Sequence, residues 1–591
     1  MMPLFNTKQV NTKLCKHTLI LILAISLSAC ASQTPPKETA EKDDKEQVAE
    51  VISVEVKKNP KPLKHTRPHA EEELKMKMEA VQVTGARQRS LAVADMSYAP
   101  VLPGHKRPGI VIPENSLAGE NYAQLKQNGV MDVLQNPVST FSIDVDTGSY
   151  SNLRRILNQG ALPPKGAVRT EELINYFDYD YATPRDQKQP FLVNSSMMAS
   201  PWNKDKYLLQ IGIKAWEQPQ DTKRDSANLV FLVDVSGSMN QPNKLPLLKK
   251  SLRMLSKQMT ANDKISIVVY AGASGVVLEP TAANNLTKIT NALDRLSAGG
   301  STNGEAGINL AYQMAESAFI KNGINRILLA TDGDFNVGQS STEALVELIE
   351  QKRKKGIALS TLGFGGGNYN DHLMEQLADK GNGSYSYIDN LLEAKKVLVD
   401  ELDSQLITVA ADVKLQLEFN PSVVSEYRLI GYENRHLNRE DFNNDQVDAG
   451  EIGAGHTVTA VYEISLASSE GRSMEPLRYQ KESAQKVDHS GELAFMRIRY
   501  KAPGESSSQL IESPLLAKTL IDSSRQPAID SKFSAAVIAF ADKLQGGKYT
   551  ANYSYEDIQK LVQQGQGNDS HGLRAEFNRL VQLAQSIDEA S

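Results

Sequence analysis

The sequence predicts a multidomain chain of the α/β plus β class, and three observations carry this prediction. Short β-branched apolar runs alternate with amphipathic helical patterns over residues 226–406, which predicts a doubly wound, mostly parallel sheet. Alternating apolar and polar residues over 191–225 and 407–505 predict strands of a β-sandwich, which the α/β domain interrupts or which flanks it. Apolar residues at helical spacing predict a helical C-terminal region over 506–591.

The composition excludes several classes of protein. The 591 residues suffice for about four domains, and 40% hydrophobic residues allow sizeable cores. With 65 Lys and Arg against 71 Asp and Glu, the net charge is −6, which argues against a nucleic-acid binder held by a basic surface. The two cysteines, Cys15 and Cys30, exclude a disulfide scaffold and cysteine-based metal sites. No apolar run reaches the roughly 18 residues of a membrane-spanning helix, so a channel or transporter is not expected.

Residues 1–29 have the pattern of a secretory signal peptide. Three lysines precede the short apolar run TLILILAISLSA, which ends in small residues. The LSAC sequence at 27–30 resembles the bacterial lipobox, in which the signal is cut before the cysteine and the thiol is lipidated. The resemblance implies a lipid on Cys30 and, because Ala31 follows it, sorting to the outer membrane. We therefore expect a lipid-anchored protein of the cell envelope that faces the periplasm.

The next two segments differ in composition. Residues 30–120 are rich in Lys, Glu and Pro and nearly lack aromatic residues, so we expect a disordered tether. Residues 121–190 predict an α+β region, because STFSIDVDT alternates like a strand and SYSNLRRILNQG has an N-cap serine and a terminal glycine. Asp144, Asp146 and Ser149 lie here, but their spacing fits no calcium-binding loop, and we interpret them as a polar strand end.

The central segment places polar side chains at the carboxyl ends of its predicted strands or just before the following helix. They are Asp234, Ser236, Ser238, Thr302 and Asp332. Ligands of doubly wound sheets bind beyond these strand ends, so we expect the five residues to form one site. Carboxylate and hydroxyl oxygens suit an octahedral Mg²⁺, with Mn²⁺ or Ca²⁺ as alternatives. Two carboxylates neutralise the dication without closing its coordination shell, which leaves one position open.

These motifs resemble the metal-ion-dependent adhesion site of von Willebrand factor type A (VWA) domains, as in the inserted domains of integrins. The sequences DVSGS, GGST and ATDG occur in the family's order within residues 226–406. The resemblance implies a Rossmann-like sheet, hydroxyl ligands from both serines of the first motif and from Thr302, and aspartates that bind directly or through water. The second motif reads GGST where the family has GGT, so Ser301 is the alternative to Thr302.

A narrower resemblance covers the chain from about residue 120 to its end. The block NYAQLKQNGVMDVLQNPVSTFSIDVDTGSYSNLRR, the VWA-like segment and the later sequence DFNNDQVDAGEIGAGHTVTAVYEI together resemble bacterial YfbK-type lipoproteins with a VWA domain. Inside that later sequence, residues 441–445 imitate the opening of a calcium-binding EF-hand loop. Gln446 stands where the loop needs Gly and Ile452 where it needs Glu, so we interpret this segment as a β-hairpin turn.

We predict a binding protein and not an enzyme. The sequence contains no GxSxG elbow, HExxH motif or Walker loop, and His372, His436 and His456 lie in no nucleophile motif. Our hypothesis is that an Asp or Glu of a protein partner completes the coordination of the bound Mg²⁺. Two alternatives stay open: a metal-assisted phosphoester hydrolase, and a structural lipoprotein whose cation only stabilises the fold. We expect no nucleic-acid partner, and membrane contact only through the N-terminal lipid.

Overall fold

The computed structural model describes seven stretches of the chain, all within the unit His105–Ser591. They are residues 117–143, 145–219, 222–333, 342–475, 477–478, 491–550 and 552–591. The predicted signal peptide, Cys30, all but the last residues of the predicted tether, and Asp144 lie outside these stretches. No helix within them has both the length and the apolar character needed to cross a membrane.

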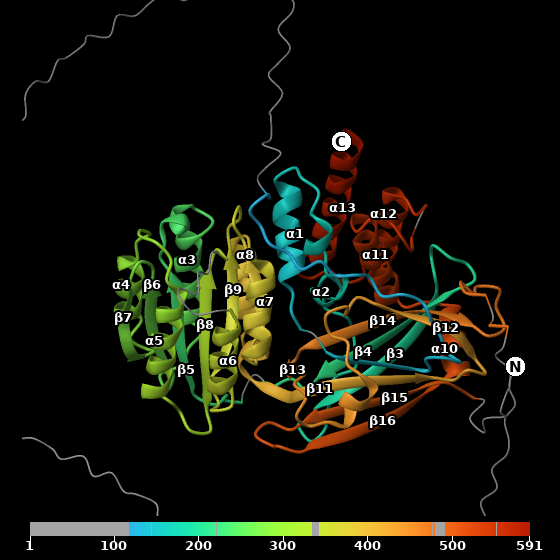
Figure 1. Ribbon diagram of the computed structural model, residues 1–591, viewed down its shortest axis with the longest axis horizontal. Helices are drawn as coiled ribbons and strands as arrows, with labels where there is room; N and C mark the ends of the chain where they lie inside the picture. The colour runs from blue at the N-terminus through green and yellow to red at the C-terminus, as the bar shows by residue number, and fades with distance from the viewer. Residues whose placement is uncertain are drawn as a thin grey trace, which may run out of the picture. The chain divides into compact units, whose positions relative to one another are not determined.

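A six-stranded sheet forms the centre of the VWA-like segment (Figure 1). Its strands are β5 (Ala227–Asp234), β6 (Lys264–Tyr270), β7 (Ser274–Ala282), β8 (Ile324–Thr331), β9 (Ala358–Phe364) and β10 (Tyr385–Ile388). The order is β10-β9-β8-β5-β6-β7; the first five strands in this order run parallel to one another, and the edge strand β7 is antiparallel to β6. The central strand β5 is buried along its whole length, as its continuous apolar run predicts for a sheet that is covered on both faces.

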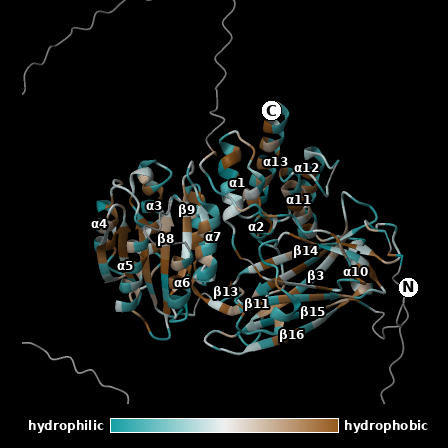
Figure 2. Cartoon of the chain, viewed as in Figure 1, coloured by the Kyte–Doolittle hydropathy of each residue, from teal (hydrophilic) through white to brown (hydrophobic). Residues whose placement is uncertain are grey.

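Helices cover both faces of this sheet, and Figure 2 shows its apolar strands between them. The side chains of β5 alternate between two cores: Leu229, Phe231 and Val233 belong to one, Val230 and Leu232 to the other. The first core includes α3 (Leu245–Ser256) and α4 (Leu286–Arg295), and the second includes α5 (Gly304–Ser317), α6 (Thr342–Arg353) and α7 (Asp371–Lys380). The predicted doubly wound α/β fold is therefore confirmed.

Two antiparallel sheets form the β-sandwich. One contains β1 (Met131–Asp132), β12 (Val424–Ile430), β14 (Thr457–Leu466), β4 (Tyr207–Ala215) and β3 (Phe191–Ala199), in that order. The other contains β13 (Gly450–Gly453), β11 (Thr408–Phe419), β15 (Glu492–Lys501) and β16 (Ser508–Leu516), and β2 (Val138–Ser142) pairs with β11. Apolar side chains of both sheets share a single core.

The α/β domain interrupts this sandwich. Strand β4 precedes it in the chain and β14 follows it, yet the two pair over eight residues, from Lys214 opposite Thr457 to Tyr207 opposite Ile464. Strand β2, from the segment STFSIDVDT, also joins the sandwich, with Phe141 opposite Leu415 of β11. The sandwich therefore uses three separated pieces of the sequence.

A helical part completes the structure. It combines α1 (Gly148–Asn158) and α2 (Thr170–Asn175) with α11 (Ile529–Leu544), α12 (Tyr555–Gln564) and α13 (Leu573–Ala590), which belong to one apolar core. Aromatic rings join the early and late segments, since Phe177 lies edge-on to Phe533 and Phe577. The shorter helix α10 (Ala517–Ser524) packs on the edge strand β3. The expected helical C-terminus is confirmed from Ala517 onward, but its predicted start at residue 506 is wrong, because β16 (Ser508–Leu516) pairs with β15 as an edge strand of the sandwich.

Candidate metal centre

Two aspartates emerge at the same edge of the VWA sheet. Asp234 is the last residue of β5, and Asp332 follows the last residue of the neighbouring parallel strand β8. Both side chains are completely buried. Burial raises the pKa of Asp234 to about 6, and the charge of Asp332 contributes to the increase. Burial and the neighbouring charge of Asp332 thus both disfavour the ionised form of Asp234.

Hydrogen bonds fix the Asp234 carboxylate and the serines that follow it. Its Oδ1 accepts from the backbone N–H of Ser236 at 2.8 Å, and its Oδ2 accepts from the Thr331 hydroxyl at 2.9 Å and the Tyr270 hydroxyl at 3.3 Å. The hydroxyl oxygens of Ser236 and Ser238 lie 3.0 Å apart. The first motif therefore folds into a tight turn that brings its oxygen donors together.

The loop that carries Thr302 packs directly against this turn. The backbone N–H of Gly237 donates to Gly300 O at 3.0 Å, and that of Gly299 donates to Val235 O at 2.8 Å. Gly300 has a φ of +87°, which a residue with a side chain rarely adopts. Thr302 is half-buried, whereas Ser301 is exposed and its hydroxyl lies close to Gly272 in the turn between β6 and β7. This placement favours Thr302 over Ser301 as the hydroxyl donor.

A buried lysine, which sequence reasoning missed, lies at the same site. Lys244 precedes α3, its side chain is only 2% exposed, and its Nζ donates to Asp332 Oδ2 at 2.8 Å. The lysine lies in KLPLLKK, which is a pattern of an amphipathic helix with solvated charges, so only the fold reveals its contact with Asp332. The site is thus composed of two carboxylates, hydroxyls and one ammonium group.

The chemistry of these donors fits a hard divalent cation. In the described part of the chain, no group of three or more His, Cys, Asp and Glu side chains could hold a metal ion, so a metal here would rely on hydroxyls as well as carboxylates. Oxygen donors of this kind suit Mg²⁺, Mn²⁺ or Ca²⁺. Such an ion would offset the repulsion between the two buried carboxylates.

The loop that imitates an EF-hand is held by lysines. Lys414 Nζ donates to the carbonyls of Asp441 and Asn444 at 3.2 and 2.5 Å, and Lys501 Nζ donates to the carbonyl of Asp445 at 2.8 Å. The side-chain oxygens of Asn443 and Asp445, which a calcium loop would use, accept from Arg499 and from the backbone N–H of Ser508 instead. The segment is not the β-hairpin turn we expected: it begins with a 3₁₀ turn, η4 (Arg439–Asn443), because the Asn438 side chain caps it, and β13 then pairs with β11.

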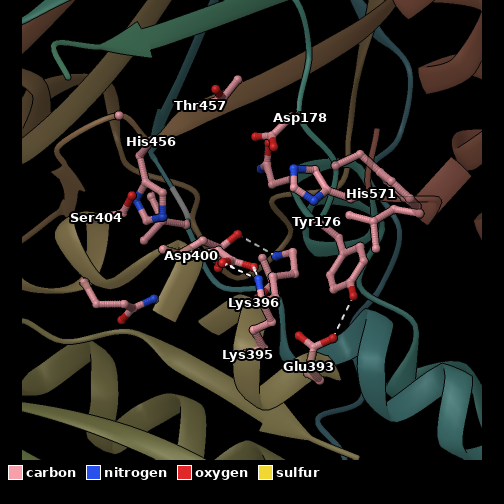
Figure 3. A pocket seen from close by; sticks show the side chains of 18 of the residues that line it. Tyr176, Asp178, Glu393, Lys395, Lys396, Asp400, Ser404, His456, Thr457 and His571 are labelled. Atoms are coloured by element: carbon pink, nitrogen blue, oxygen red, sulfur yellow. Dashed lines mark hydrogen bonds and ion pairs between the residues drawn. The ribbon is translucent and has the colours of Figure 1, made fainter. Parts of the chain in front are cut away.

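A separate cavity of about 850 Å³ lies among the end of the VWA-like segment, the sandwich and the helical part (Figure 3). Its lining is strongly charged, but many of the charges are paired: Lys396 with Glu401 at 2.6 Å, and Glu393 with Arg154 at 2.7 Å and with the Tyr176 hydroxyl at 2.6 Å. His456 also lines it, and burial lowers the pKa of this histidine to about 4, so it is neutral near neutral pH.

The cavity does not place His456 in a catalytic pair with the serine beside it. The Ser404 hydroxyl donates to Ala454 O at 2.8 Å and not to the imidazole. A Ser–His nucleophile requires a hydrogen bond between the two side chains. Ser404 and His456 therefore both line the cavity without forming such a pair.

Three family models match the chain. The model of the von Willebrand factor type A domain matches residues 228–400, a model described as von Willebrand factor matches 116–210, and one described as uncharacterized protein YfbK, C-terminal, matches 404–587. The protein described as uncharacterized protein YfbK of Escherichia coli (strain K12) is 47% identical over 477 residues, which are 80% of this chain and 82% of that protein. The chain belongs to the YfbK family.

The YfbK-type chain has more distant relatives. The protein sll0103 of Synechocystis is 24% identical over 338 residues, which are 56% of this chain and 75% of that protein. Among solved structures, the von Willebrand factor type A protein from Catenulispora acidiphila is 15% identical with a TM-score of 0.38, covering 67% of this chain and 91% of that one. The α/β domain of this YfbK-type protein is a VWA domain, and VWA domains generally mediate interactions between proteins.

Proposed function

We propose that this protein is a lipid-anchored envelope protein whose VWA domain binds a protein partner through a divalent cation. The observation that supports this most directly is the convergence of Asp234 and Asp332 beside the hydroxyls of Ser236 and Ser238 at the ends of adjacent parallel strands. With Thr302 on the adjoining loop, these side chains would hold Mg²⁺. Mn²⁺ and Ca²⁺ share the same donor preference.

The bound ion would act as the recognition group. It supplies a concentrated positive charge that attracts an anionic ligand atom. The protein contributes two carboxylates, so an aspartate or glutamate of the partner completes the coordination at the open position. The surrounding loops, from Val235 to Gly237 and from Gly299 to Thr302, then select the partner by shape and charge.

The predicted signal peptide and lipobox support the location. A lipid on Cys30 would anchor the protein in the outer membrane, and residues 31–120 would tether the folded part in the periplasm. The partner is then another protein of the cell envelope. Radiolabelled fatty acid incorporated into the wild type but not into Cys30→Ser would support the anchor, and equal labelling of both would reject it.

Affinity capture tests the metal-dependent interaction. The mature chain is used to capture proteins from solubilised envelopes in Mg²⁺, in EDTA and as Asp234→Ala, with Asp294→Ala as the control because Asp294 is exposed on α4. We expect a partner that the wild type and the control retain only in Mg²⁺ and that Asp234→Ala does not retain. Capture of the same proteins under all conditions would refute the proposal and leave the cation a structural role. Phosphoester turnover that is lost in EDTA and in Asp332→Ala would instead identify a hydrolase.

A further inference from the structure

Lys244 lies where a basic side chain is expected to be unfavourable. It immediately precedes α3, and its backbone carbonyl accepts from Leu248 in the first turn of that helix. The N-terminus of a helix carries partial positive charge, so a lysine there is disfavoured unless an anion compensates it. The carboxylate of Asp332, 2.8 Å from Lys244 Nζ, provides that compensation. The lysine is therefore part of the site and not a surface charge.

The backbone holds this lysine in place. Gly365 follows β9, and a Cβ built on it would lie only 2.3 Å from Cε and 2.5 Å from Cγ of Lys244. The Tyr387 hydroxyl donates to the carbonyl of Gly365 and fixes that segment against the lysine stem. The stem thus packs between α3 and the end of β9, and the side chain is only 2% exposed beside Asp332.

The net charge of the site determines which ligands it can bind. Asp234 and Asp332 bring two negative charges, and Lys244 brings one positive charge. With a dication bound, the site carries a net charge of about +1, whereas two carboxylates alone would bring it to neutrality. A carboxylate from a partner would then neutralise the loaded site completely.

We propose that Lys244 is a resident counter-cation of the metal centre, which lowers its affinity for divalent ions and raises the affinity of the ion-loaded site for carboxylate ligands. This inference rests on the proposed function, since it concerns the same ion and the same class of partner. The two effects have opposite signs, and this separates the role from a purely structural one. If Lys244 only packed against Gly365, its replacement would not shift the affinity for divalent ions and the affinity for carboxylate ligands in opposite directions.

The test measures the metal alone and then a carboxylate probe. Isothermal titration gives the Mg²⁺ affinity of the whole chain as wild type, Lys244→Met and Lys244→Gln, with Asp332→Asn as the site control. Lys249→Met is the matched control, because Lys249 lies on the helix that Lys244 precedes but its Nζ donates to Asp294 O and Leu296 O. We expect both Lys244 variants to bind Mg²⁺ about tenfold more tightly or better, as removal of a neighbouring charge predicts, and Lys249→Met to match the wild type.

The carboxylate probe is acetate, added to the Mn²⁺-loaded proteins. Acetate that displaces a metal-bound water lowers the proton relaxation enhancement, and we expect a several-fold weaker acetate affinity in the Lys244 variants. Thermal unfolding shows whether either Lys244 variant is unstable. If one is, the other variant is used for the test.

The outcomes separate the inference from the proposed function. Mg²⁺ binding that Asp332→Asn abolishes, but that both Lys244 variants leave unchanged or weaken, overturns the inference and leaves the proposed site intact. No Mg²⁺ binding in any variant overturns both. Mg²⁺ binding that appears only when Lys244 is removed supports the lowered metal affinity but overturns the proposed function, because the wild-type site would then be closed to the metal.

Discussion

Arg169, just before α2, donates to the carboxylate of Asp371 at the start of α7, although each side chain is only 1% exposed. The same guanidinium pairs with Glu172, and the Tyr385 hydroxyl donates to Asp371 at 2.5 Å. Charges are buried at such depth only when they are paired and hydrogen-bonded. This pair joins the segment between the sandwich strands β2 and β3 to a helix of the VWA domain.

Breaking this pair from one side should strongly destabilise the protein. Arg169→Met removes the guanidinium that compensates the buried charges of Asp371 and Glu172, and removal of one member of a buried pair costs about 3–5 kcal/mol. Arg169→Met combined with Asp371→Asn should recover part of that loss. Urea unfolding, monitored by circular dichroism, gives the free energy of unfolding of the wild type and of each variant.

The control for this comparison is an exposed pair. Arg525→Ala removes an ion pair with Asp522 whose side chains are 76% and 53% exposed, and it should change stability by at most about 0.5 kcal/mol. Equal losses for Arg169→Met and Arg525→Ala would show that the buried pair does not hold the two segments together.

The sequence pattern was sufficient for the fold class and for the position of Asp234 at a strand end, because both depend on local order. The continuous apolar run of β5 and the polar residues directly after it place Asp234 at a strand end without knowledge of any distant residue. A sandwich with strands from both sides of the α/β domain was also foreseeable from the alternating segments there, but the structure was needed to pair β4 with β14.

The charged contacts could not be predicted, because they join residues far apart in the chain. Lys244 and Asp332 are 88 positions apart, and Arg169 and Asp371 are 202 apart. A charged residue in an amphipathic pattern indicates a solvated face unless its partner is known. The EF-hand-like segment was misinterpreted for the same reason, since Lys414 reaches its carbonyls from β11.

Divalent ions should stabilise the protein through Asp332. A ligand that binds only the folded state at about 100 times its Kd adds about 2.7 kcal/mol to stability. Mg²⁺ should therefore raise the Tm of the wild type and of Asp294→Asn but leave Asp332→Asn unchanged. Differential scanning calorimetry with and without EDTA measures this, and a Tm increase that persists in Asp332→Asn would place the ion elsewhere.

Gly365 should affect the metal centre through Lys244. Gly365→Ala would push its Cβ into the lysine stem, whereas nothing lies within 4 Å of the Cβ position of Gly367. Both glycines have positive φ, +71° and +97°, so Gly367→Ala controls for backbone strain. We expect Gly365→Ala to lower the Tm further and to alter Mg²⁺ affinity, while Gly367→Ala leaves the affinity unchanged. Matching affinities for both variants would show that the lysine does not depend on this glycine.

Glu451 on β13 should make stability depend on pH. Burial raises its pKa to about 7 despite the opposing charge of Arg326 on β8, and Asp412 and Asp448 contribute to the increase. Because the folded-state pKa lies above the ordinary value of 4.5, Glu451 stabilises the fold fully below that value. That contribution is lost as the pH rises through about 7, and it amounts to at most about 3 kcal/mol.

Glu451→Gln isolates this effect, since the amide is neutral at every pH. Asn382 Nδ2 donates to Glu451 Oε1 at 2.5 Å and Thr408 Oγ1 donates to Oε2 at 3.5 Å, and a glutamine can accept at one of these positions. We expect the Tm of the variant to match the wild type near pH 5 and to exceed it increasingly toward pH 8. Parallel Tm curves for the two proteins over this range would show that Glu451 stays ionised in the fold, with Arg326 compensating its burial.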